Sequence, residues 1–169
     1  IEMIPLALVT QAACEDPECS TSVSADSCPA TTPGLRCAGE VSLPPVLSSP
    51  LGEDCVFFLE TSDRRQLSPR EGCALETAVR NSGLRVVMLR VADSLDLADN
   101  TTCHIYHGLR ESITFLHISP VSFSAGTPLE GFFTGLKIED SMNRVVHTAD
   151  ALRLLVIQRF GGFYSDTDV

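Results

Sequence analysis

Residues 144–169, RVVHTADALRLLVIQRFGGFYSDTDV, decide how this chain folds, because they join a helix, a break and a strand end. Apolar side chains recur there at the three-to-four spacing of an amphipathic helix: Val145, Ala149, Leu152, Val156 and Phe160. Gly161 and Gly162 end the helix, since glycine adopts the left-handed conformation found at helix C-termini. Phe163 and Tyr164 favour a strand. The stretch therefore predicts a helix followed by a short strand.

Two carboxylates follow this predicted strand. Asp166 and Asp168 are two residues apart, so both side chains can reach one small region. Carboxylate oxygens suit Mg²⁺ or Mn²⁺, and such ions are often held by one or two carboxylates together with substrate phosphates. A divalent ion there would make a diphosphate a better leaving group. The alternative is a solvated turn. On the preceding helix, Asp150 and Arg153 share a face, where they pair or contact a common ligand.

Upstream, apolar runs and turn residues predict a strand–helix–strand unit. The predicted strands are 55–61, 84–91 and 113–118, and the predicted helix is 69–81, which Pro69 begins and Gly83 ends. Strand, helix and strand at this spacing form a βαβ unit, which predicts a parallel pair. Residues 93–99 are expected to be a polar loop and residues 119–143 a Gly- and Pro-punctuated connection. The sequence thus predicts an α/β fold with a mostly parallel sheet and flanking helices.

Two blocks of sequence resemble the DXD-containing, sugar-binding glycosyltransferases. The first block reads His147-Thr148-x-Asp150-x-x-Arg153 and then Gly161-Gly162-x-Tyr164-x-Asp166-x-Asp168. The second reads Phe57-Phe58-Leu59-Glu60-Thr61-Ser62-Asp63-Arg64 and then Cys73-x-x-Glu76-x-x-x-Arg80. The blocks occur in the family's order and cover roughly residues 55–169. More narrowly, they are similar to the group of lactosylceramide 4-alpha-galactosyltransferases and alpha-1,4-N-acetylglucosaminyltransferases. This resemblance implies a GT-A-like (Rossmann-like) nucleotide-sugar-binding fold.

The resemblance also implies roles for the matching residues. The donor-binding candidates are Thr61, Ser62, Asp63, His147, Asp150, Arg153, Tyr164 and Asp166. Asp168 is the candidate direct ligand of Mn²⁺ or Mg²⁺, and Asp166 binds the metal more loosely or contacts the ribose and donor sugar. From the residues alone, Asp150 and Arg153 could equally form a surface ion pair. The family usually has serine before that aspartate, whereas Ala149 lacks the hydroxyl. No catalytic nucleophile or base is identified.

The activity implied by the resemblance is that of a metal-dependent, retaining hexosyltransferase. It would transfer galactose from UDP-galactose to a galactose-terminated, lactosylceramide-like glycolipid in alpha-1,4 linkage. Two alternatives stay open: transfer of N-acetylglucosamine, and a non-catalytic secreted domain held together by disulfides. The resemblance further implies a type II membrane glycoprotein of glycosphingolipid biosynthesis on the lumenal side of the Golgi membrane. We interpret the chain as an N-terminal fragment of such an enzyme, inactive by itself.

Composition and charge set the class of partner. A net charge of −10 argues against nucleic acid, whose binding needs clustered Lys and Arg. An apolar content of 44% in 169 residues suffices for one core. We expect residues 1–54, rich in Ser, Thr, Pro and Cys, to be a loosely ordered stem, and 55–169 to be the donor-binding part. Residues 1–13 are too short for a bilayer-spanning helix, which needs ~20 apolar residues. They are either the remnant of a signal anchor or a fragment end, and the anchor that the resemblance implies is not expected in this fragment.

Cysteines and a glycosylation triplet point to the secretory pathway. The chain has seven cysteines, and the four in the predicted stem would form a disulfide knot or, as the alternative, a zinc site: Cys14, Cys19, Cys28 and Cys37. We expect a Cys73–Cys103 disulfide that ties the predicted helix to the loop after the second strand. Asn100-Thr101-Thr102 is an N-glycosylation acceptor sequence. The three nearby histidines are not expected to bind metal: His104, His107 and His117.

Overall fold

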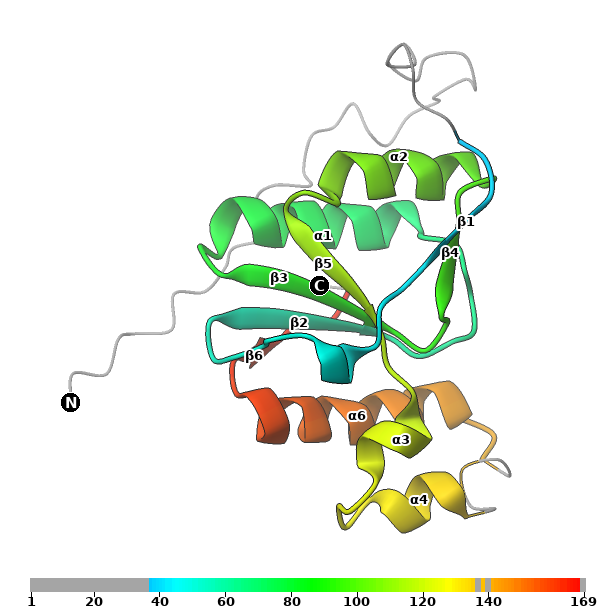
Figure 1. The fold of residues 1–169 in the computed structure, drawn as a ribbon, viewed down its shortest axis with the longest axis vertical. Helices are drawn as coiled ribbons and strands as arrows, with labels where there is room; N and C mark the ends of the chain where they lie inside the picture. Colours follow the sequence, from blue (N-terminus) through cyan, green and yellow to red (C-terminus); the bar gives the residue numbers. More distant parts are fainter. Residues whose placement is uncertain (1–36, 136–137, 139–140, 168–169) are drawn as a thin grey trace, which may run out of the picture. The chain divides into compact units, whose positions relative to one another are not determined.

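The computed structural model describes residues 37–167 apart from 136–137 and 139–140, and these residues belong to one compact unit. Its centre is a four-stranded parallel sheet in the order β5-β3-β2-β6 (Figure 1). The strands are β2 (Cys55–Glu60), β3 (Arg85–Arg90), β5 (Ile113–His117) and β6 (Phe163–Tyr164). The parallel pair expected from the βαβ spacing, β2 with β3, is present along both strands. The predicted α/β class with a parallel sheet is therefore confirmed.

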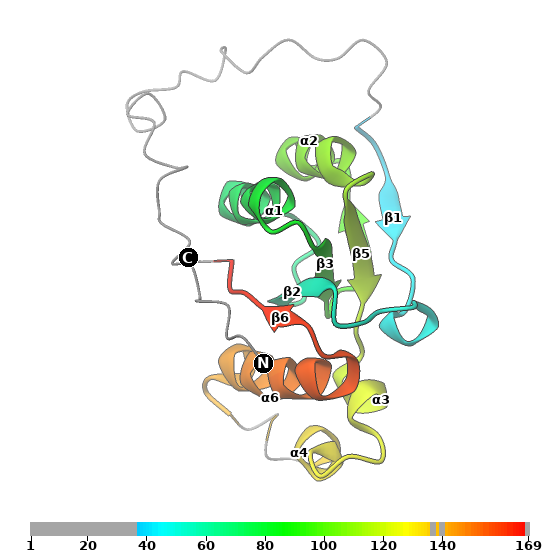
Figure 2. The same ribbon diagram turned by 90° about the vertical axis from the view of Figure 1, so that its left-hand side faces the viewer.

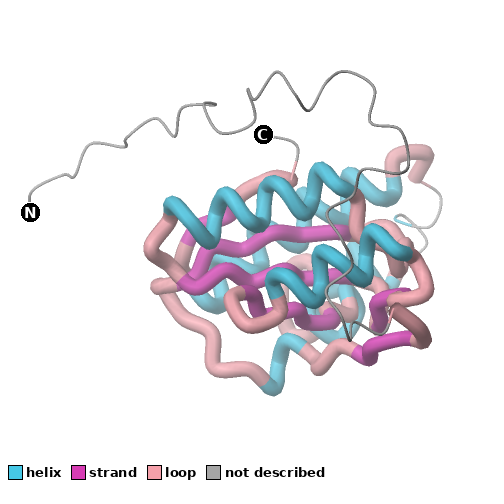
Figure 3. The backbone as a smooth tube through the Cα atoms, turned by 90° about the horizontal axis from the view of Figure 1, so that it is seen from above, coloured by secondary structure: helices cyan, strands magenta, loops and turns pink. Residues whose placement is uncertain are grey.

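Helices cover both faces of this sheet, so that it forms the middle of three layers (Figure 2). One face carries α1 (Pro69–Asn81) and α2 (Asn100–Leu109), and the other carries α3 (Pro120–Ser124), α4 (Glu130–Thr134) and α6 (Arg144–Phe160). Figure 3 looks down on the sheet from the side that carries α1 and α2, with the strands behind these helices. No helix within the described ranges is long and apolar enough to cross a membrane.

The central strands are apolar on both sides because both faces are covered. In β2, Phe57 and Leu59 belong to the core beneath α6, whereas Val56 and Phe58 belong to the core beneath α1 and α2. This alternation follows from the two-residue period of a strand. A continuous apolar run is the pattern expected of a parallel strand buried on both faces.

Helix α1 begins and ends where the sequence predicts. Ser68 is its N-cap, and Pro69 occupies the first turn, where a missing N–H does no harm. The Ser68 side chain accepts from the Glu71 N–H, while the Glu71 carboxylate accepts from the Ser68 N–H at 2.7 Å. This reciprocal capping box satisfies two N–H groups at the start of the helix.

Helix α6 has the predicted bounds but a different buried face. The residues that it buries are Thr148, Ala151, Leu152, Leu155 and Val156. Leu152 and Val156 belong to the predicted apolar stripe, but the side chain of Val145 is 48% exposed. The observed buried face is therefore rotated by part of a turn from the predicted stripe. Thr148 and Ala151 are buried but too weakly apolar to indicate this face from sequence.

The compact unit begins earlier than the expected boundary at residue 54. β1 (Glu40–Ser42) pairs antiparallel with β4 (Ser94–Asp96), and η2 (Val46–Ser48) follows it. Leu43 and Val46 are buried in the core, so residues 37–54 pack with the sheet domain. Residues 93–99, expected to be a polar loop, contain β4. The predicted stem before residue 37, with Cys14, Cys19 and Cys28, lies outside the described residues.

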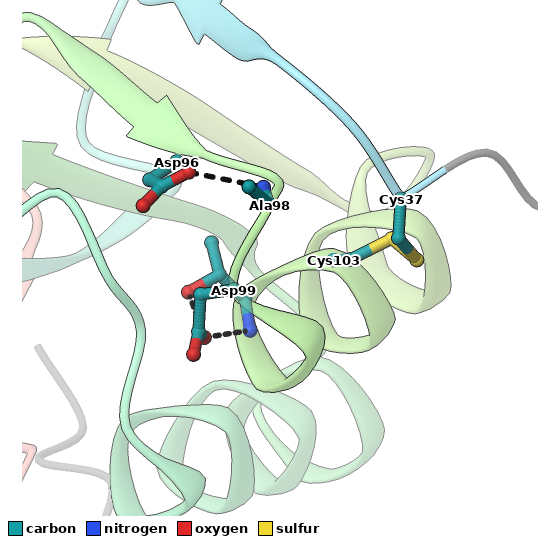
Figure 4. Close-up of a disulfide and its surroundings, with 6 residues drawn as sticks. Cys37, Asp96, Ala98, Asp99 and Cys103 are labelled. Carbon is teal, nitrogen blue, oxygen red and sulfur yellow. Dashed lines mark hydrogen bonds between the residues drawn. A yellow bond between two sulfur atoms is a disulfide. The ribbon is translucent and has the colours of Figure 1, made fainter.

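Cys37 forms a disulfide with Cys103, so the expected Cys73–Cys103 pairing is wrong (Figure 4). The Cα atoms of the bonded pair are 5.5 Å apart. The pairing of β1 with β4, just before α2, brings the segment that precedes β1 close to this helix. The sequence alone places Cys37 in the predicted stem, because a strand as short as β1 has no recognisable pattern. Cys73 lies on α1, outside this bridge.

Candidate functional site

The candidate residues gather at one edge of the sheet. β2 and β6 are parallel, so the segments that follow them, residues 61–68 and 165–167, leave from the same edge. Helix α6 leads into β6 and runs back across the sheet, which places its first turns at this edge too (Figure 1). The Thr61 hydroxyl links the loop after β2 to the first turn of α6, because it donates a hydrogen bond to the Val145 carbonyl at 2.9 Å. In open α/β sheets, ligands bind at the carboxyl ends of the strands.

Two glycines direct the chain from α6 into β6. Gly161 and Gly162 have φ values of 73° and 77°, in the left-handed region, as their position at the helix end predicts. A Cβ on Gly162 would be 2.5 Å from the Cys55 carbonyl oxygen, so only glycine allows this close approach to β2. The Ser165 N–H then donates to the Phe57 carbonyl at 2.9 Å. These contacts fix the backbone immediately before Asp166.

Four of the candidate residues form one contact group, which we call the Arg153 cluster: Asp150, Arg153, Tyr164 and Asp166. Arg153 Nη2 lies 2.6 Å from Asp150 Oδ1, and Nη1 lies 4.0 Å from Asp166 Oδ2. The Arg153 guanidinium lies over the Tyr164 ring, 4.9 Å from its centroid. The Tyr164 hydroxyl donates to Asp166 Oδ1. The helix face and the strand end that the sequence suggested therefore meet in space.

The Arg153 cluster joins a cation to two carboxylates that remain open to solvent. The side chains of Asp150 and Asp166 are 57% and 46% exposed. Arg153 Nε is buried and has no hydrogen-bond partner among the described residues. Exposed carboxylates accept hydrogen bonds from hydroxyl groups, and a guanidinium has a rigid fork that suits anionic oxygens. The cluster can thus bind a ligand that carries both hydroxyls and negative charge.

The loop after β2 is held from within by Glu60. Its Oε1 accepts from the Ser62 N–H at 2.8 Å and from the Ser62 hydroxyl at 2.6 Å, and Oε2 pairs with Arg64. Burial by itself would raise the pKa of Glu60, but the hydrogen bonds from Ser62 and Arg64 outweigh it and lower the pKa. Ser62 therefore has its hydroxyl and N–H engaged inside the loop.

The other candidates differ in what they contact. Asp63 is exposed, with no hydrogen bond or ion pair to the part of the chain that the structure describes. His147 is also exposed, and its Nδ1 lies 2.7 Å from the Ser141 hydroxyl. Thr61 is half-buried at its contact with Val145. Asp63 and His147 are thus available to a ligand, and Thr61 already connects the loop to α6.

The candidate metal ligands are only partly described. Asp168 lies outside the described residues, and so does its distance to Asp166. Within the described ranges, no three His, Cys, Asp or Glu side chains gather closely enough to hold a metal ion. Asp166 has Oδ1 bonded to Tyr164 and Oδ2 near Arg153. That environment fits a carboxylate that contacts a metal loosely or binds sugar hydroxyls, as the sequence suggests for Asp166.

The predicted glycosylation site lies at the start of α2. Asn100 is its first residue and is exposed, and Asp99 is the N-cap. Thr102 is fully buried, where its hydroxyl donates to Asp99 Oδ2 and accepts from the Leu67 N–H, both at 2.8 Å. The acceptor asparagine therefore faces solvent while the threonine of the same triplet belongs to the interior.

Sequence reasoning missed two residues that support the site. Arg90, the last residue of β3, is 0% exposed and pairs with the buried Glu71 of α1 at 3.1 Å. For Arg90 the sequence signal was its position as a charged residue directly after the apolar run of β3. For Glu71 it was the Ser68-x-x-Glu71 spacing of a capping box, which predicts a position at the first turn but not an ion pair.

A hollow of about 320 Å³ lies elsewhere, at the C-terminal half of α6. Phe123, Thr127, Leu155 and Arg159 contribute to its lining, which contains no carboxylate. Arg159 lies over the Phe123 ring, 5.1 Å from its centroid. This hollow lacks the carboxylates that the Arg153 cluster presents, so it is not the candidate site.

Comparison with known proteins confirms the resemblance seen in the two sequence blocks. Residues 105–169, which contain the whole Arg153 cluster, match the family described as "Glycosyltransferase sugar-binding region containing DXD motif". The chain is also 28% identical over 120 residues to human (Homo sapiens) alpha-1,4-N-acetylglucosaminyltransferase, a match that covers 68% of this chain. Residues 105–169 are thus similar to the DXD region of this glycosyltransferase family.

The matches extend over only part of the proteins concerned. The chain spans about a third of the length of the human relative, 35%. Among solved structures it is similar to the PaToxG glycosyltransferase, with a TM-score of 0.47 and 19% identity over 75% of this chain and 44% of that chain.

Proposed function

We propose that this chain is the donor-binding part of a metal-dependent glycosyltransferase that uses a UDP-sugar. The observation that carries the proposal is the Arg153 cluster, which combines Asp150 and Arg153 of α6 with Asp166 after β6. It lies at the carboxyl edge of a parallel sheet, within the region that matches the DXD family. In that location an exposed carboxylate suits sugar hydroxyls and the guanidinium suits the donor's charge.

The contacts of the described side chains support a separate role for each of them. Asp150 and Asp166 accept hydrogen bonds from donor hydroxyls, and Arg153 holds both carboxylates in place. Thr61 and Asp63 meet the nucleotide at the end of β2. Ser62 supports the loop internally, since its hydroxyl already donates to Glu60. Asp168 and, more loosely, Asp166 would hold Mn²⁺ or Mg²⁺, which stabilises negative charge on the diphosphate leaving group.

We propose that the transferred sugar is galactose and that the acceptor is a galactose-terminated glycolipid. The transfer forms an alpha-1,4 linkage and retains the configuration at the anomeric carbon. The enzyme would act in the Golgi lumen. The cysteines, the Asn100 triplet and the Cys37–Cys103 disulfide support a secretory compartment. N-acetylglucosamine is a second candidate, which the human alpha-1,4-N-acetylglucosaminyltransferase favours. In either case we propose that the full-length protein is a type II membrane protein.

The test is UDP binding by the full-length protein, measured by calorimetry with and without Mn²⁺. We expect binding that needs Mn²⁺, is lost on chelation, and weakens at least tenfold in Asp168→Ala, since Asp168 would hold the ion that offsets the charge of the diphosphate. The control is Glu111→Ala, an exposed carboxylate just before β5, at the opposite edge of the sheet. It should bind UDP like the wild type.

Either of two results would contradict the proposal. Folded wild-type protein that binds no UDP in the presence of Mn²⁺ would favour the non-catalytic, disulfide-held domain instead. Equal affinities for Asp168→Ala and the wild type would exclude the carboxylate pair as the metal site. Competition between UDP-galactose and UDP-N-acetylglucosamine on the same protein then identifies the donor sugar.

A further inference from the structure

Arg90 is a buried cation whose hydrogen bonds go to the backbone of the loop after β2. Its Nη2 donates to the carbonyl oxygens of Arg64 at 2.8 Å and Gln66 at 3.0 Å. Its Nη1 donates to Glu71 Oε1 at 3.1 Å. One guanidinium therefore fixes two carbonyls of the loop against the first turn of α1. A lysine ammonium has no comparable planar fork.

Stability alone is a weak explanation for this arrangement. Arginine is almost never fully buried unless it is paired, and burial lowers the pKa of Arg90 because the charged form loses its hydration. A buried ion pair often stabilises a protein no more than apolar residues of the same volume, and its better-attested contribution is to select one conformation. The conformation selected here is that of residues 61–66.

The same loop is held at a second point, which leaves one acidic side chain facing outward. Glu60 binds both the N–H and the hydroxyl of Ser62, and Arg64 pairs with Glu60. Arg64 Nη2 also lies 3.7 Å from Glu71 Oε2, so the half-buried Glu60 and the buried Glu71 share one surface cation. Between these fixed points Asp63 is exposed, at the edge of the sheet that carries the Arg153 cluster.

We propose that Arg90, paired with Glu71, is a positioning residue of the donor site, which holds the loop after β2 in the conformation that binds the UDP moiety. This inference rests on the proposed function. If the loop adopted that conformation only a tenth of the time, the apparent Kd for UDP would rise tenfold, because binding must then select the competent fraction.

The test variant is Arg90→Met combined with Glu71→Gln, in the full-length protein. Replacing both partners leaves no buried, unpaired charge, which would otherwise destabilise the fold severely. Glutamine at the third helical position still completes the capping box with Ser68. The matched control is Arg85→Met with Asp54→Asn. Arg85 pairs with Asp54 at 2.7 Å, but on the surface and at the opposite end of β3.

Hydrogen exchange and UDP calorimetry with Mn²⁺ provide separate readings. In the Arg90→Met/Glu71→Gln variant we expect amides of residues 61–66 to exchange about tenfold faster while those of β5 stay protected. The Kd for UDP should rise about tenfold, and saturating UDP should restore slow exchange in the loop. The Arg85→Met/Asp54→Asn control should match the wild type in both measurements.

Each other outcome has a definite meaning. Unchanged exchange in residues 61–66 would show that Arg90 does not hold the loop, and faster exchange with an unchanged Kd would show that the loop does not serve the donor site. Both results overturn the inference but leave metal-dependent UDP binding intact, and the second also removes the nucleotide contacts proposed for Thr61 and Asp63. If the wild type binds no UDP, the proposed function fails, and the inference fails with it.

Discussion

Gly162 lies where the chain turns from α6 into β6, with a φ of 77°. A Cβ at this position would be 2.5 Å from the Cys55 carbonyl oxygen and 3.0 Å from Phe57 Cε2. We expect Gly162→Ala to lower the free energy of unfolding by about 3 kcal/mol, because strain in a left-handed alanine adds to the displacement of the β2 backbone. Urea denaturation followed by circular dichroism measures the loss.

Gly83 separates the two contributions. Its φ of 65° is also left-handed, but a Cβ there meets nothing within 4 Å. Gly83→Ala should therefore show the conformational strain alone, about 1 kcal/mol. If both variants lost the same free energy of unfolding, close contact with β2 would not explain the glycine at position 162.

Contacts within the Arg153 cluster were predictable only in part. The spacing of Asp150 and Arg153 indicates a shared helix face, and the structure pairs them at 2.6 Å. Tyr164 ends β6 and Asp166 follows two residues later, the spacing at which side chains of a strand face the same side, and the two side chains are hydrogen-bonded. The position of Arg153 over the Tyr164 ring depends on how α6 packs, which no spacing reveals.

At the scale of elements, α2 depends on a single carboxylate at its N-terminus. The Asp99 side chain accepts from the Thr102 N–H and hydroxyl, and these two hydrogen bonds lower the pKa of Asp99. A carboxyl group whose pKa is lower in the folded state stabilises that state. The stabilisation is fully present above the unfolded-state pKa of about 3.9, and it is lost as pH falls through the folded-state pKa.

Asp99→Ser tests this pH dependence, since serine caps a helix as well as aspartate does but does not titrate. We expect the variant to have nearly the wild-type free energy of unfolding at pH 7. Below about pH 4 the wild type should lose more stability than the variant does. Urea denaturation from pH 2 to 7 measures the difference between the two proteins. A difference that stayed constant over this range would contradict the stabilising role of ionised Asp99.

Elements with a strong repeat of their own were found from sequence, and elements defined by contacts were not. Apolar runs identify β2, β3 and β5, and helical spacing or capping residues identify α1 and α6. The predicted ranges of these elements agree with the structure to within a residue or two. β1 and β4 have three residues each, too few to show a period, and exist because they pair with each other. Helix α2 was missed because its first turn, Asn-Thr-Thr-Cys, favours helices poorly.

At the scale of the molecule, the Cys37–Cys103 disulfide closes a loop across a sequence separation of 66. On the chain-entropy model, removing such a bridge lowers the free energy of unfolding by about 4 kcal/mol. We expect this loss in Cys37→Ser/Cys103→Ala, measured by urea denaturation, and the wild type should approach the variant's stability in a reducing agent.

Cys73→Ala provides the contrast. With the bridge between Cys37 and Cys103, this variant should keep the disulfide, and mass spectrometry of a non-reduced digest should still find the two peptides joined. A Cys73→Ala protein that lost its link to Cys103 would restore the pairing first expected from the sequence. The same digest would then show Cys37 outside the bridge.

The order of strands also has a consequence for synthesis of the chain. β2 gains β3 as a neighbour early, but its other edge pairs with β6, where Val56 lies opposite Phe163, about a hundred residues later. At ~5–20 residues per second, the ribosome needs about 5–20 s to supply that partner. Throughout this interval the backbone edge of Val56 and Phe57 lacks its β6 partner, and such an apolar edge readily associates with other chains. We therefore expect nascent chains that stop before residue 163 to need chaperones in order to stay soluble.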